Sequence, residues 1–391
     1  MKILIAGAGI GGLTAALCLA RSGHKICVLE QSVQFRQVGA GIQCGANALQ
    51  VFDYLGLLPA LELLSVAPER VEFKDYQTGA VLYQMPLGNT YRNRFDKPYW
   101  NLHRADILSV LRNAVQTNKN IEIHLNTKLE SYSELPEQVQ VNTNQGSFSG
   151  ELLIGADGIH SKVRALMYGK HAPIFTGNLA WRAVVPVERL RKNWMPTIVS
   201  NFVGPKKHAV LYYLRNKELA NLVGVVENSN WQDSSWMTSA PLEELHTDFA
   251  GWHSTLRDFI EVIDPSECYR WALHDHKALD SWHSSRTVLL GDAAHASLPF
   301  MAAGGAMAIE DARVLDRALS KFDSLSDALA CYQSTRLPRT SKIQGLSRKA
   351  GSLYHFQGSF MRRAAFMGMK LMAKKNEYLL PSYNANIVKL S

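Results

Sequence analysis

Residues 3–21 read ILIAGAGIGGLTAALCLAR, and this stretch decides the fold of the amino-terminal part of the chain. Its first four residues are apolar and predict a short, buried strand of a parallel sheet. Gly7, Gly9 and Gly12 match the pattern G-x-G-x-x-G, and a helix is expected directly after them. The stretch therefore predicts a strand–turn–helix unit in which the helix N-terminus receives a phosphate group.

Each glycine of this turn has its own expected role. Gly7 allows the tight turn, Gly9 lets the backbone approach a pyrophosphate, and Gly12 lets the helix pack closely on the strand. A second strand is expected at residues 25–29, and it ends at Glu30. An acidic residue about 20 positions after the glycines can bind both hydroxyls of an adenosine ribose, and it would repel a 2′-phosphate. FAD or NAD is therefore favoured over NADP as the bound nucleotide.

Residues 3–20 also resemble a signal or membrane segment in length and apolar character. We reject that interpretation because a single lysine precedes the stretch, its glycines would weaken a spanning helix, and Glu30 lies where a nucleotide needs it. The chain has 391 residues, which is enough for two domains. Its 47% hydrophobic and 19% charged residues are typical of a globular protein.

Cysteine usage and net charge exclude several classes of protein. The five cysteines are scattered and form no C-x-x-C pair, so we expect neither a disulfide framework nor a metal site, and we expect a cytoplasmic location. The net charge of +8 indicates attraction to anions. We expect no nucleic-acid partner, because no helix-turn-helix, zinc-finger or RNP-like pattern accompanies the charge. An anionic nucleotide and an anionic small substrate explain the charge more simply.

The rest of the chain changes character twice. The segment GAGIQ at residues 39–43 is a second glycine-rich turn. Between about residues 175 and 227, strand-like runs follow one another without helices, which predicts a mostly antiparallel sheet in a separate layer. Another buried strand at residues 287–290 ends at a Gly-Asp pair, and helical patterns continue from there to about residue 375.

Taken in order, these motifs resemble those of the single-component FAD-dependent aromatic hydroxylases, the salicylate hydroxylase-like group A flavoprotein monooxygenases with the para-hydroxybenzoate hydroxylase fold. The resemblance covers nearly the whole chain. It rests on GAGIGG at 7–12 with Glu30, GAGIQ at 39–43, LHRAD at 102–106, LIGADGIHSKVR at 153–164, AWR at 180–182, GDAAH at 291–295 and AIEDA at 308–312.

The resemblance implies an α/β fold with three parts. These are a Rossmann-like FAD-binding domain with a mostly parallel sheet, a substrate domain with a mostly antiparallel β-sheet, and a helical C-terminal segment. The expected FAD-binding domain is discontinuous and includes the C-terminal helices, and its segments are 1–70, 100–172 and 285–391. The expected substrate domain consists of residues 71–99 and 173–284.

The resemblance also implies one bound FAD, with NADH or NADPH and O2 as co-substrates. The FAD-binding residues carried over by motif are Gly7, Gly9, Gly12, Glu30, Arg104, Leu129, Asp157, Asp292, Gly304 and Gly305. Arg104 would meet the pyrophosphate, and Leu129 would offer backbone groups to the adenine. Asp292 would accept a hydrogen bond from a ribityl hydroxyl.

Two further motifs would contribute to the same site. Asp157 lies in a motif that the family links to both FAD and the nicotinamide coenzyme. The helix after Gly304 and Gly305 would direct its N-terminus at the flavin N1 and O2 edge. Other roles stay open, because Arg104 could form a surface ion pair and both aspartates could cap helices.

In the family, hydride passes from the nicotinamide to FAD, O2 gives a flavin C4a-hydroperoxide, and this species hydroxylates an electron-rich aromatic ring. A group that deprotonates a substrate phenol would help, and His208 and Tyr213 are the candidate catalytic residues. Candidate substrate contacts are Arg182, Tyr212 and Pro299. Strand alternation puts Tyr212 and Tyr213 on opposite faces, so only one can line the pocket. A purely structural role for these strand residues stays open.

The chain departs from the family at residues 302–305, which read AAGG where many relatives have Gln-Gly. The missing glutamine amide makes it unsafe to carry over a substrate, so the expected partner is a small aromatic molecule, phenolic or an aromatic acid. Alternatives are a related monooxygenase acting on a quinone precursor or polyketide-like scaffold, and a flavin-binding protein without turnover.

The C-terminal residues 360–375 form a basic amphipathic pattern. Such a helix could rest on an anionic membrane, but we favour a helix that covers the FAD-binding domain or a dimer contact. A monomer or a homodimer is expected.

Overall fold

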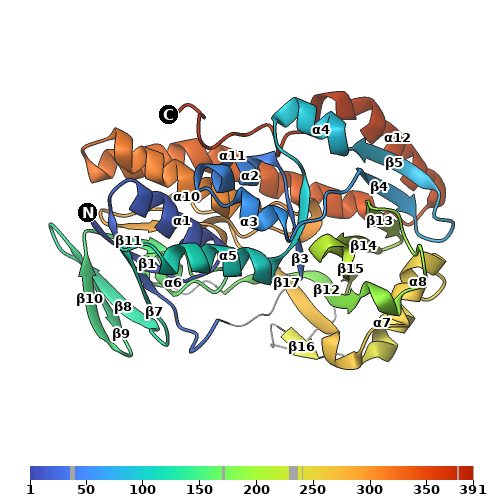
Figure 1. The fold of residues 1–391 in the computed structure, drawn as a ribbon, viewed down its shortest axis with the longest axis horizontal. Helices are drawn as coiled ribbons and strands as arrows, with labels where there is room; N and C mark the ends of the chain where they lie inside the picture. Colours follow the sequence, from blue (N-terminus) through green and yellow to red (C-terminus); the bar gives the residue numbers. More distant parts are fainter. Residues whose placement is uncertain (36–39, 170–171, 229–236, 240, 377, 391) are drawn as a thin grey trace.

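The computed structural model describes residues 1–35, 40–169, 172–228, 237–239, 241–376 and 378–390. Two large sheets organise this part of the chain, one in each half of the molecule (Figure 1). The second glycine-rich turn lies partly outside the described residues. Its described end, Gly41–Cys44, is strand β3, which pairs with β6 (Trp100–His103) instead of forming a turn.

The first sheet is parallel throughout, as far as the chain is described. In spatial order its strands are β18 (Thr287–Leu289), β11 (Leu152–Gly155), β1 (Lys2–Ala6), β2 (Lys25–Leu29) and β7 (Ile121–His124). The central strands are almost entirely buried, which explains why their sequences are continuous apolar runs. A three-stranded sheet packs beside β1, and it consists of β10 (Gly146–Gly150), β9 (Val139–Thr143) and β8 (Leu129–Glu134).

The second large sheet has eight strands within the described ranges. In spatial order they are β16 (Met237–Ser239), β17 (Tyr269–Asp275), β12 (Ile174–Pro186), β15 (Leu219–Glu227), β14 (Lys207–Leu214), β13 (Val199–Gly204), β4 (Arg70–Asp75) and β5 (Val81–Pro86). Every neighbouring pair is antiparallel except β13 and β4. The α/β fold with one parallel and one mostly antiparallel sheet is thus confirmed.

Helices connect and cover the sheets. They are α1 (Ile10–Arg21), α2 (Ala46–Tyr54), α3 (Leu58–Glu62), α4 (Gly88–Phe95), α5 (Arg104–Gln116), α6 (Lys162–Tyr168), α7 (Leu242–Asp248), α8 (Ser254–Ile260), α9 (Asp292–His295), α10 (Gly304–Lys321), α11 (Leu325–Tyr354) and α12 (Ser359–Asn376). Short 3-10 turns are η1 (Val187–Arg189), η2 (Arg215–Lys217), η3 (Pro265–Glu267) and η4 (Pro299–Met301). Helix α1 packs against α5 and α10 in the half of the molecule that contains the parallel sheet (Figure 1).

The last helix corrects one expectation about the C-terminus. Helix α12 packs on the β4–β5 end of the second sheet, where the ring centroids of Phe366 and Phe73 are 5.3 Å apart. Arg362 forms a buried ion pair of 2.9 Å with Asp75 in the same region. The basic helix therefore covers the sheet assigned to the substrate domain instead of the FAD-binding domain. Among the described helices none is both long and apolar enough to cross a membrane. The remaining domain boundaries stay a prediction.

Candidate active site

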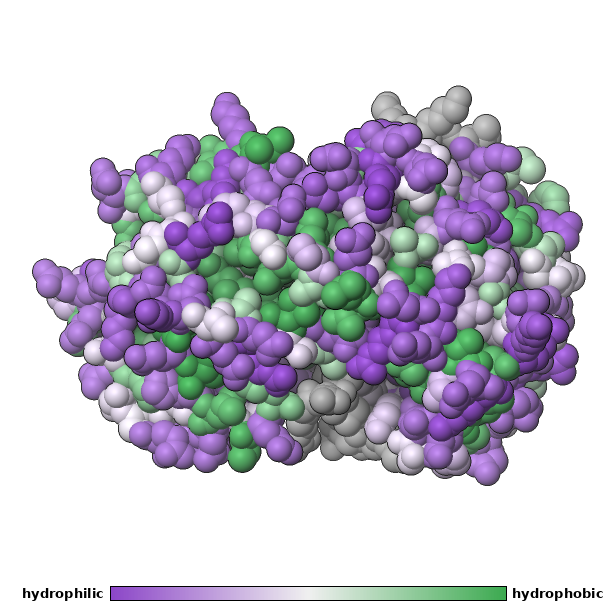
Figure 2. Space-filling view, in the orientation of Figure 1, coloured by the Kyte–Doolittle hydropathy of each residue, from purple (hydrophilic) through white to green (hydrophobic). Residues whose placement is uncertain are grey.

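A cavity of about 1490 Å³ is lined by residues from both large sheets. On one side it meets the turn after β1, Glu30 after β2, and α5, whose Ser109 and Arg112 belong to the lining. On the other side it meets β12, β14 and β15. Figure 2 shows that the molecular surface is hollowed and apolar in the region where α3 and α5 lie in Figure 1.

The glycine turn leaves room for a ligand at one position. A Cβ on Gly9 would have no atom of the described residues within 4 Å, and Gly9 lines the cavity. Gly7 has φ +103°, and its Cβ would lie 2.5 Å from the carbonyl oxygen of Ala156. A Cβ on Gly12 would overlap the carbonyl of Gly7. Gly7 and Gly12 thus shape the turn without lining the cavity, while Gly9 faces the open space in front of α1.

The N-terminus of α1 is open toward this space. Within the described ranges, helix α1 has no side-chain cap, and its first turn has no acidic residue, so its first N–H groups are available to an anion. Glu30 lies beside it, with Oε2 accepting from the N–H of Ala8 and Oε1 from the N–H of Ser32, both at 2.8 Å. Each carboxylate oxygen has a second lone pair, which can accept from a ribose hydroxyl.

Asp292 and the α10 N-terminus form a second binding region. Gly304 begins α10, and a Cβ there would lie 3.8 Å from Oδ1 of Asp292. No side chain in the described part of the chain caps α10, which leaves its first N–H groups available toward the cavity lined by Gly304 and Gly305. The Asp292 side chain is open to the cavity, while the surrounding protein raises the pKa of its carboxyl by desolvation. A hydroxyl donor in the cavity would stabilise the ionised form.

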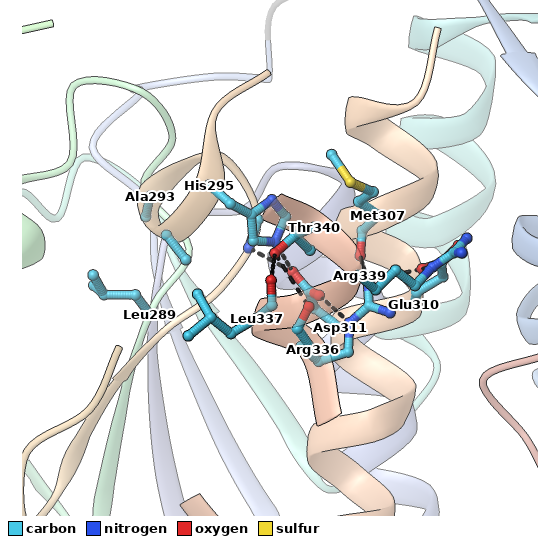
Figure 3. Close-up of polar contacts among 12 residues, drawn as sticks. Leu289, Ala293, His295, Met307, Glu310, Asp311, Arg336, Leu337, Arg339 and Thr340 are labelled. Atoms are coloured by element: carbon cyan, nitrogen blue, oxygen red, sulfur yellow. Dashed lines mark hydrogen bonds and ion pairs between the residues drawn. The ribbon is translucent and has the colours of Figure 1, made fainter. Parts of the chain in front are cut away.

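A buried ionic network behind this region holds it in place (Figure 3). Asp311 Oδ2 accepts from the N–H of Gly291 at 3.0 Å and contacts Nε2 of His295 at 2.5 Å. Nε of Arg336 donates to the other oxygen of Asp311 at 2.7 Å, and Nη2 of Arg336 pairs with Glu310 at 2.8 Å. The network joins α9, α10 and α11, so it fixes the turn that presents Asp292.

Asp157 caps a helix, as one of the open alternatives predicted. Its Oδ2 accepts from the N–H groups of Lys162 and Val163 at 2.7 and 3.1 Å, and Ser161 donates its hydroxyl to Oδ1 at 2.5 Å. Asp157 also lines the cavity, so capping and ligand contact are compatible. Leu129 lies in β8 and is not part of the described cavity lining, so its contact with adenine stays a prediction.

Arg104 and Arg182 place two cations at the cavity. Arg104 begins α5, and among the described residues its guanidinium has no hydrogen-bond partner. Arg182 stacks on the ring of Trp271, with 4.3 Å from Cζ to the centroid, and its buried Nε has no partner within the described structure. Burial, together with the nearby charge of Arg104, lowers the pKa of Arg182 to about 10. Arg182 therefore stays charged at neutral pH, and both guanidinium groups suit an anionic ligand.

Strand β14 forms the wall of the cavity with every second residue. His208, Val210 and Tyr212 line the cavity, as the strand period of two requires. Tyr213 points to the opposite side, where its hydroxyl donates to the carbonyl of Met195 at 2.7 Å. The structure therefore does not bring Tyr213 to the cavity, and its candidacy as a catalytic residue is not supported. Burial raises the pKa of the Tyr212 hydroxyl, which keeps Tyr212 a hydrogen-bond donor.

Pro299 lines the cavity at the start of η4, and its carbonyl accepts from the N–H of Ala302 at 2.9 Å. Ala302 has φ +50°, a left-handed conformation in which a non-glycine residue is strained. Ala303 is 2% exposed and also lines the cavity, so the position where the family resemblance led us to expect a glutamine lies at the site itself.

Comparison with known proteins agrees with this geometry. The FAD binding domain family model matches residues 1–346. The 3-hydroxybenzoate 6-hydroxylase of Polaromonas naphthalenivorans is 36% identical over 361 residues, which cover 92% of this chain and 89% of that protein. The 6-hydroxynicotinate 3-monooxygenase of Bordetella bronchiseptica is 32% identical over 352 residues, covering 88% and 90% of the two chains. The chain belongs to the FAD-dependent aromatic hydroxylases.

A solved structure supports the fold of this hydroxylase. A salicylate hydroxylase substrate complex superposes with a TM-score of 0.83 at 24% identity, and the match covers 98% of this chain and 96% of that one. The cavity residues fit FAD: open space at Gly9, the uncapped N-termini of α1 and α10, and an unpaired Arg104 within the described ranges all suit a dinucleotide. The cofactor supplies the redox chemistry with NAD(P)H and O2, while the hydroxylase binds and orients its substrate.

Sequence reasoning missed several residues of the site. Asp311 and Arg336 fix the Asp292 turn, and Trp271 supports Arg182, but none of these roles follows from a local pattern. His355 is a further example, because it contacts His208 from 147 positions away. Only the AIEDA motif could have drawn attention to Asp311 in advance.

Proposed function

We propose that this hydroxylase acts on a phenolic aromatic acid, using FAD, NAD(P)H and O2. Arg182 carries the proposal, because it offers the cavity a charged guanidinium whose buried Nε has no partner among the described residues. A carboxylate on the substrate would satisfy this donor and form a charge-assisted hydrogen bond. The relatives named for 3-hydroxybenzoate and 6-hydroxynicotinate support the same class of substrate.

His208 is proposed to accept the proton of the substrate hydroxyl. It lies on the same face of the sheet as Arg182, since both side chains line the cavity, from β14 and from β12 on the other side of β15. Burial holds the pKa of His208 well below its usual range, and the neighbouring His355 adds to this effect. His208 is therefore neutral at pH 7 and can accept a proton. A substrate in its phenolate form is a better nucleophile for oxygen transfer.

The test compares 3-hydroxybenzoate with two analogues that each lack one group. Benzoate keeps the carboxylate but lacks the hydroxyl, and phenol keeps the hydroxyl but lacks the carboxylate. The proposal predicts that 3-hydroxybenzoate stimulates NAD(P)H oxidation and gives a hydroxylated product in equal amount. Equal stimulation by phenol would contradict the role of Arg182, and peroxide as the sole product across phenolic acids would contradict the proposed substrate class.

The expectations of a cytoplasmic location and of a monomer or homodimer also stay proposals. All five cysteines are buried and free, which supports a reducing environment. Size-exclusion chromatography with light scattering tests the oligomeric state.

A further inference from the structure

His208 is the first of three side chains that lead away from the cavity. Its Nδ1 lies 2.8 Å from Nε2 of His355, and Nδ1 of His355 lies 2.8 Å from Oε1 of Glu227. His208 and His355 are buried, whereas the side chain of Glu227 is 41% exposed. The row therefore begins at the cavity wall and ends at a carboxylate in contact with solvent.

The backbone holds this row in place. His355 follows the end of α11, and its carbonyl accepts from the N–H of Lys206 at 3.1 Å. The carbonyl of Lys206 accepts in turn from the N–H of Glu227 at 3.0 Å. Lys206, in the turn between β13 and β14, thus links the backbones of His355 and Glu227. The rings of Phe300 and Tyr354 flank His208, with centroids 5.4 and 5.3 Å from its own.

The carboxylate of Glu227 determines which nitrogen carries the proton in each neutral ring. An ionised carboxylate only accepts hydrogen bonds, so Nδ1 of His355 must carry a proton. Nε2 of a neutral His355 then has a lone pair, and Nδ1 of His208 must donate to it. Consequently Nε2 of His208 is left with a lone pair on the side of the ring away from His355. Burial lowers the pKa of both histidines, which favours these neutral forms.

We propose that His208, His355 and Glu227 form a proton path from the substrate cavity to the surface, in which His355 and Glu227 are positioning residues that leave a lone pair on Nε2 of the resting His208 and then pass on the proton that His208 receives. The inference rests on the proposed function, because a phenolic substrate supplies the proton. His355 and Glu227 touch neither the substrate nor the cofactor in this proposal. They act through His208.

Each transfer conserves atoms and electrons. The O–H bond of the substrate breaks, its electron pair stays on the phenolate oxygen, and the proton binds Nε2 of His208. The proton on Nδ1 of His208 moves to Nε2 of His355, and the proton on Nδ1 of His355 moves to Glu227 and then to water. No group is oxidised or reduced. Reverse transfer, when the product is reprotonated, restores both rings to their starting tautomers.

The first test reads the tautomers without any turnover. Nitrogen NMR of the FAD-loaded protein, labelled with ¹⁵N at histidine, distinguishes protonated from unprotonated ring nitrogens, and His208→Gln and His355→Gln variants assign the signals. We expect protons on Nδ1 of both rings and a lone pair on Nε2 of His208. Glu227→Leu should abolish this preference. A proton on Nε2 of His208 in the unchanged protein would overturn the proposal.

The second test follows the proton itself. Mixing the FAD-loaded protein with 3-hydroxybenzoate and a pH indicator in weak buffer measures the rate of proton release. Glu227→Gln keeps a hydrogen-bond acceptor but loses the proton acceptor, so release should slow by about tenfold or more. Glu227→Asp should restore part of the rate. Glu218→Gln is the matched control, because Glu218 is an exposed carboxylate just before the other end of β15.

A failure of the proton path and a failure of the proposed function would give different results. An unchanged release rate in Glu227→Gln would overturn the proton path while leaving the phenolic substrate intact. A wild-type protein that binds no phenolic acid would contradict the proposed function, and the NMR tautomers would then decide whether the arrangement of His208, His355 and Glu227 exists.

Discussion

Gly41 lies against the aromatic ring of Tyr212. A Cβ on Gly41 would overlap that ring and would lie 2.5 Å from its hydroxyl oxygen. The N–H of Gly41 donates to Oδ1 of Asn221 at 2.7 Å, which holds β3 at this distance. Strands β3 and β14, which lie far apart in the sequence, thus form one wall of the cavity. The absence of a side chain at Gly41 leaves room for the ring of Tyr212 in this wall.

Gly41→Ala should therefore displace Tyr212. Overpacking of this kind costs about 1–3 kcal/mol. We expect a lower free energy of unfolding, together with a higher KM for the aromatic substrate, because the cavity wall shifts. Urea unfolding at a fixed FAD concentration and steady-state kinetics measure the two effects.

Gly345→Ala is the control for this substitution. Gly345 lies within α11, and a Cβ on it would meet no atom of a neighbouring element within 4 Å, so alanine should fit and slightly favour the helix. Equal loss of stability in both variants would contradict a specific conflict between Gly41 and Tyr212.

Arg182→Gln should weaken binding of an aromatic acid. Hydrogen bonds to charged groups contribute about 1.5–3 kcal/mol, so KM should rise roughly 10- to 100-fold. FAD retention should change little, because the proposed partner of Arg182 is the substrate. Kinetics with 3-hydroxybenzoate and flavin absorbance of the purified variant provide the measurements.

Arg270→Gln is a control from the opposite face of the same sheet. Arg270 stacks on Trp181 with 4.9 Å to the ring centroid, as Arg182 stacks on Trp271. Arg270 pairs with Glu244 and does not line the cavity. If the two variants raised KM equally, the substrate role of Arg182 would be refuted.

Asp311→Asn should destabilise the protein in a pH-dependent way. Burial alone would raise the pKa of Asp311, but His295 and Arg336 outweigh it and lower that pKa to about 2. A depressed carboxyl pKa contributes stability that is complete above the unfolded value of about 4 and is lost as the pH falls toward 2. Breaking such a buried pair costs about 3–5 kcal/mol at neutral pH.

Unfolding measured between pH 7 and pH 3 checks this prediction. The difference in the free energy of unfolding between wild type and Asp311→Asn should be largest at neutral pH and should become smaller below about pH 4. Asp323→Asn, at an exposed position after α10, should leave stability unchanged. A constant difference across the pH range would mean that the charge of Asp311 is not what stabilises the network.

Asp292→Ala should weaken FAD retention. Losing a hydrogen bond that a carboxylate accepts costs about 1.5–3 kcal/mol, so the Kd for FAD should rise at least about tenfold. Fluorescence titration of the apoprotein with FAD measures this Kd, and exposed Asp280→Ala is the control. Unchanged FAD affinity would argue against the assigned ribityl contact.

The sequence predicted those parts of the fold and site that depend on local pattern. The G-x-G-x-x-G turn, the strand ending before Glu30 and the alternation of Tyr212 and Tyr213 follow from periodicity and glycine geometry over a few residues. Capping by Asp157 was also among the expected alternatives, because a cap needs only residues three to six positions apart.

What the sequence could not predict depends on tertiary packing. His355 meets His208, and Arg336 meets Asp311, only because α11 lies across both regions. The pairing of Gly41–Cys44 with β6 is decided by a partner strand more than 50 positions away, and α12 covers β4 and β5 through contacts such as that of Arg362 with Asp75. No local propensity encodes such contacts.

The central claim is that this FAD-loaded protein hydroxylates a phenolic acid whose carboxylate is bound by Arg182. Mass spectrometry of the product formed from 3-hydroxybenzoate, NAD(P)H and ¹⁸O2 tests it most directly. We expect one ¹⁸O atom in the aromatic product for each NAD(P)H oxidised, with KM raised by Arg182→Gln. Product without ¹⁸O, or NAD(P)H oxidation that yields peroxide alone, would contradict the claim.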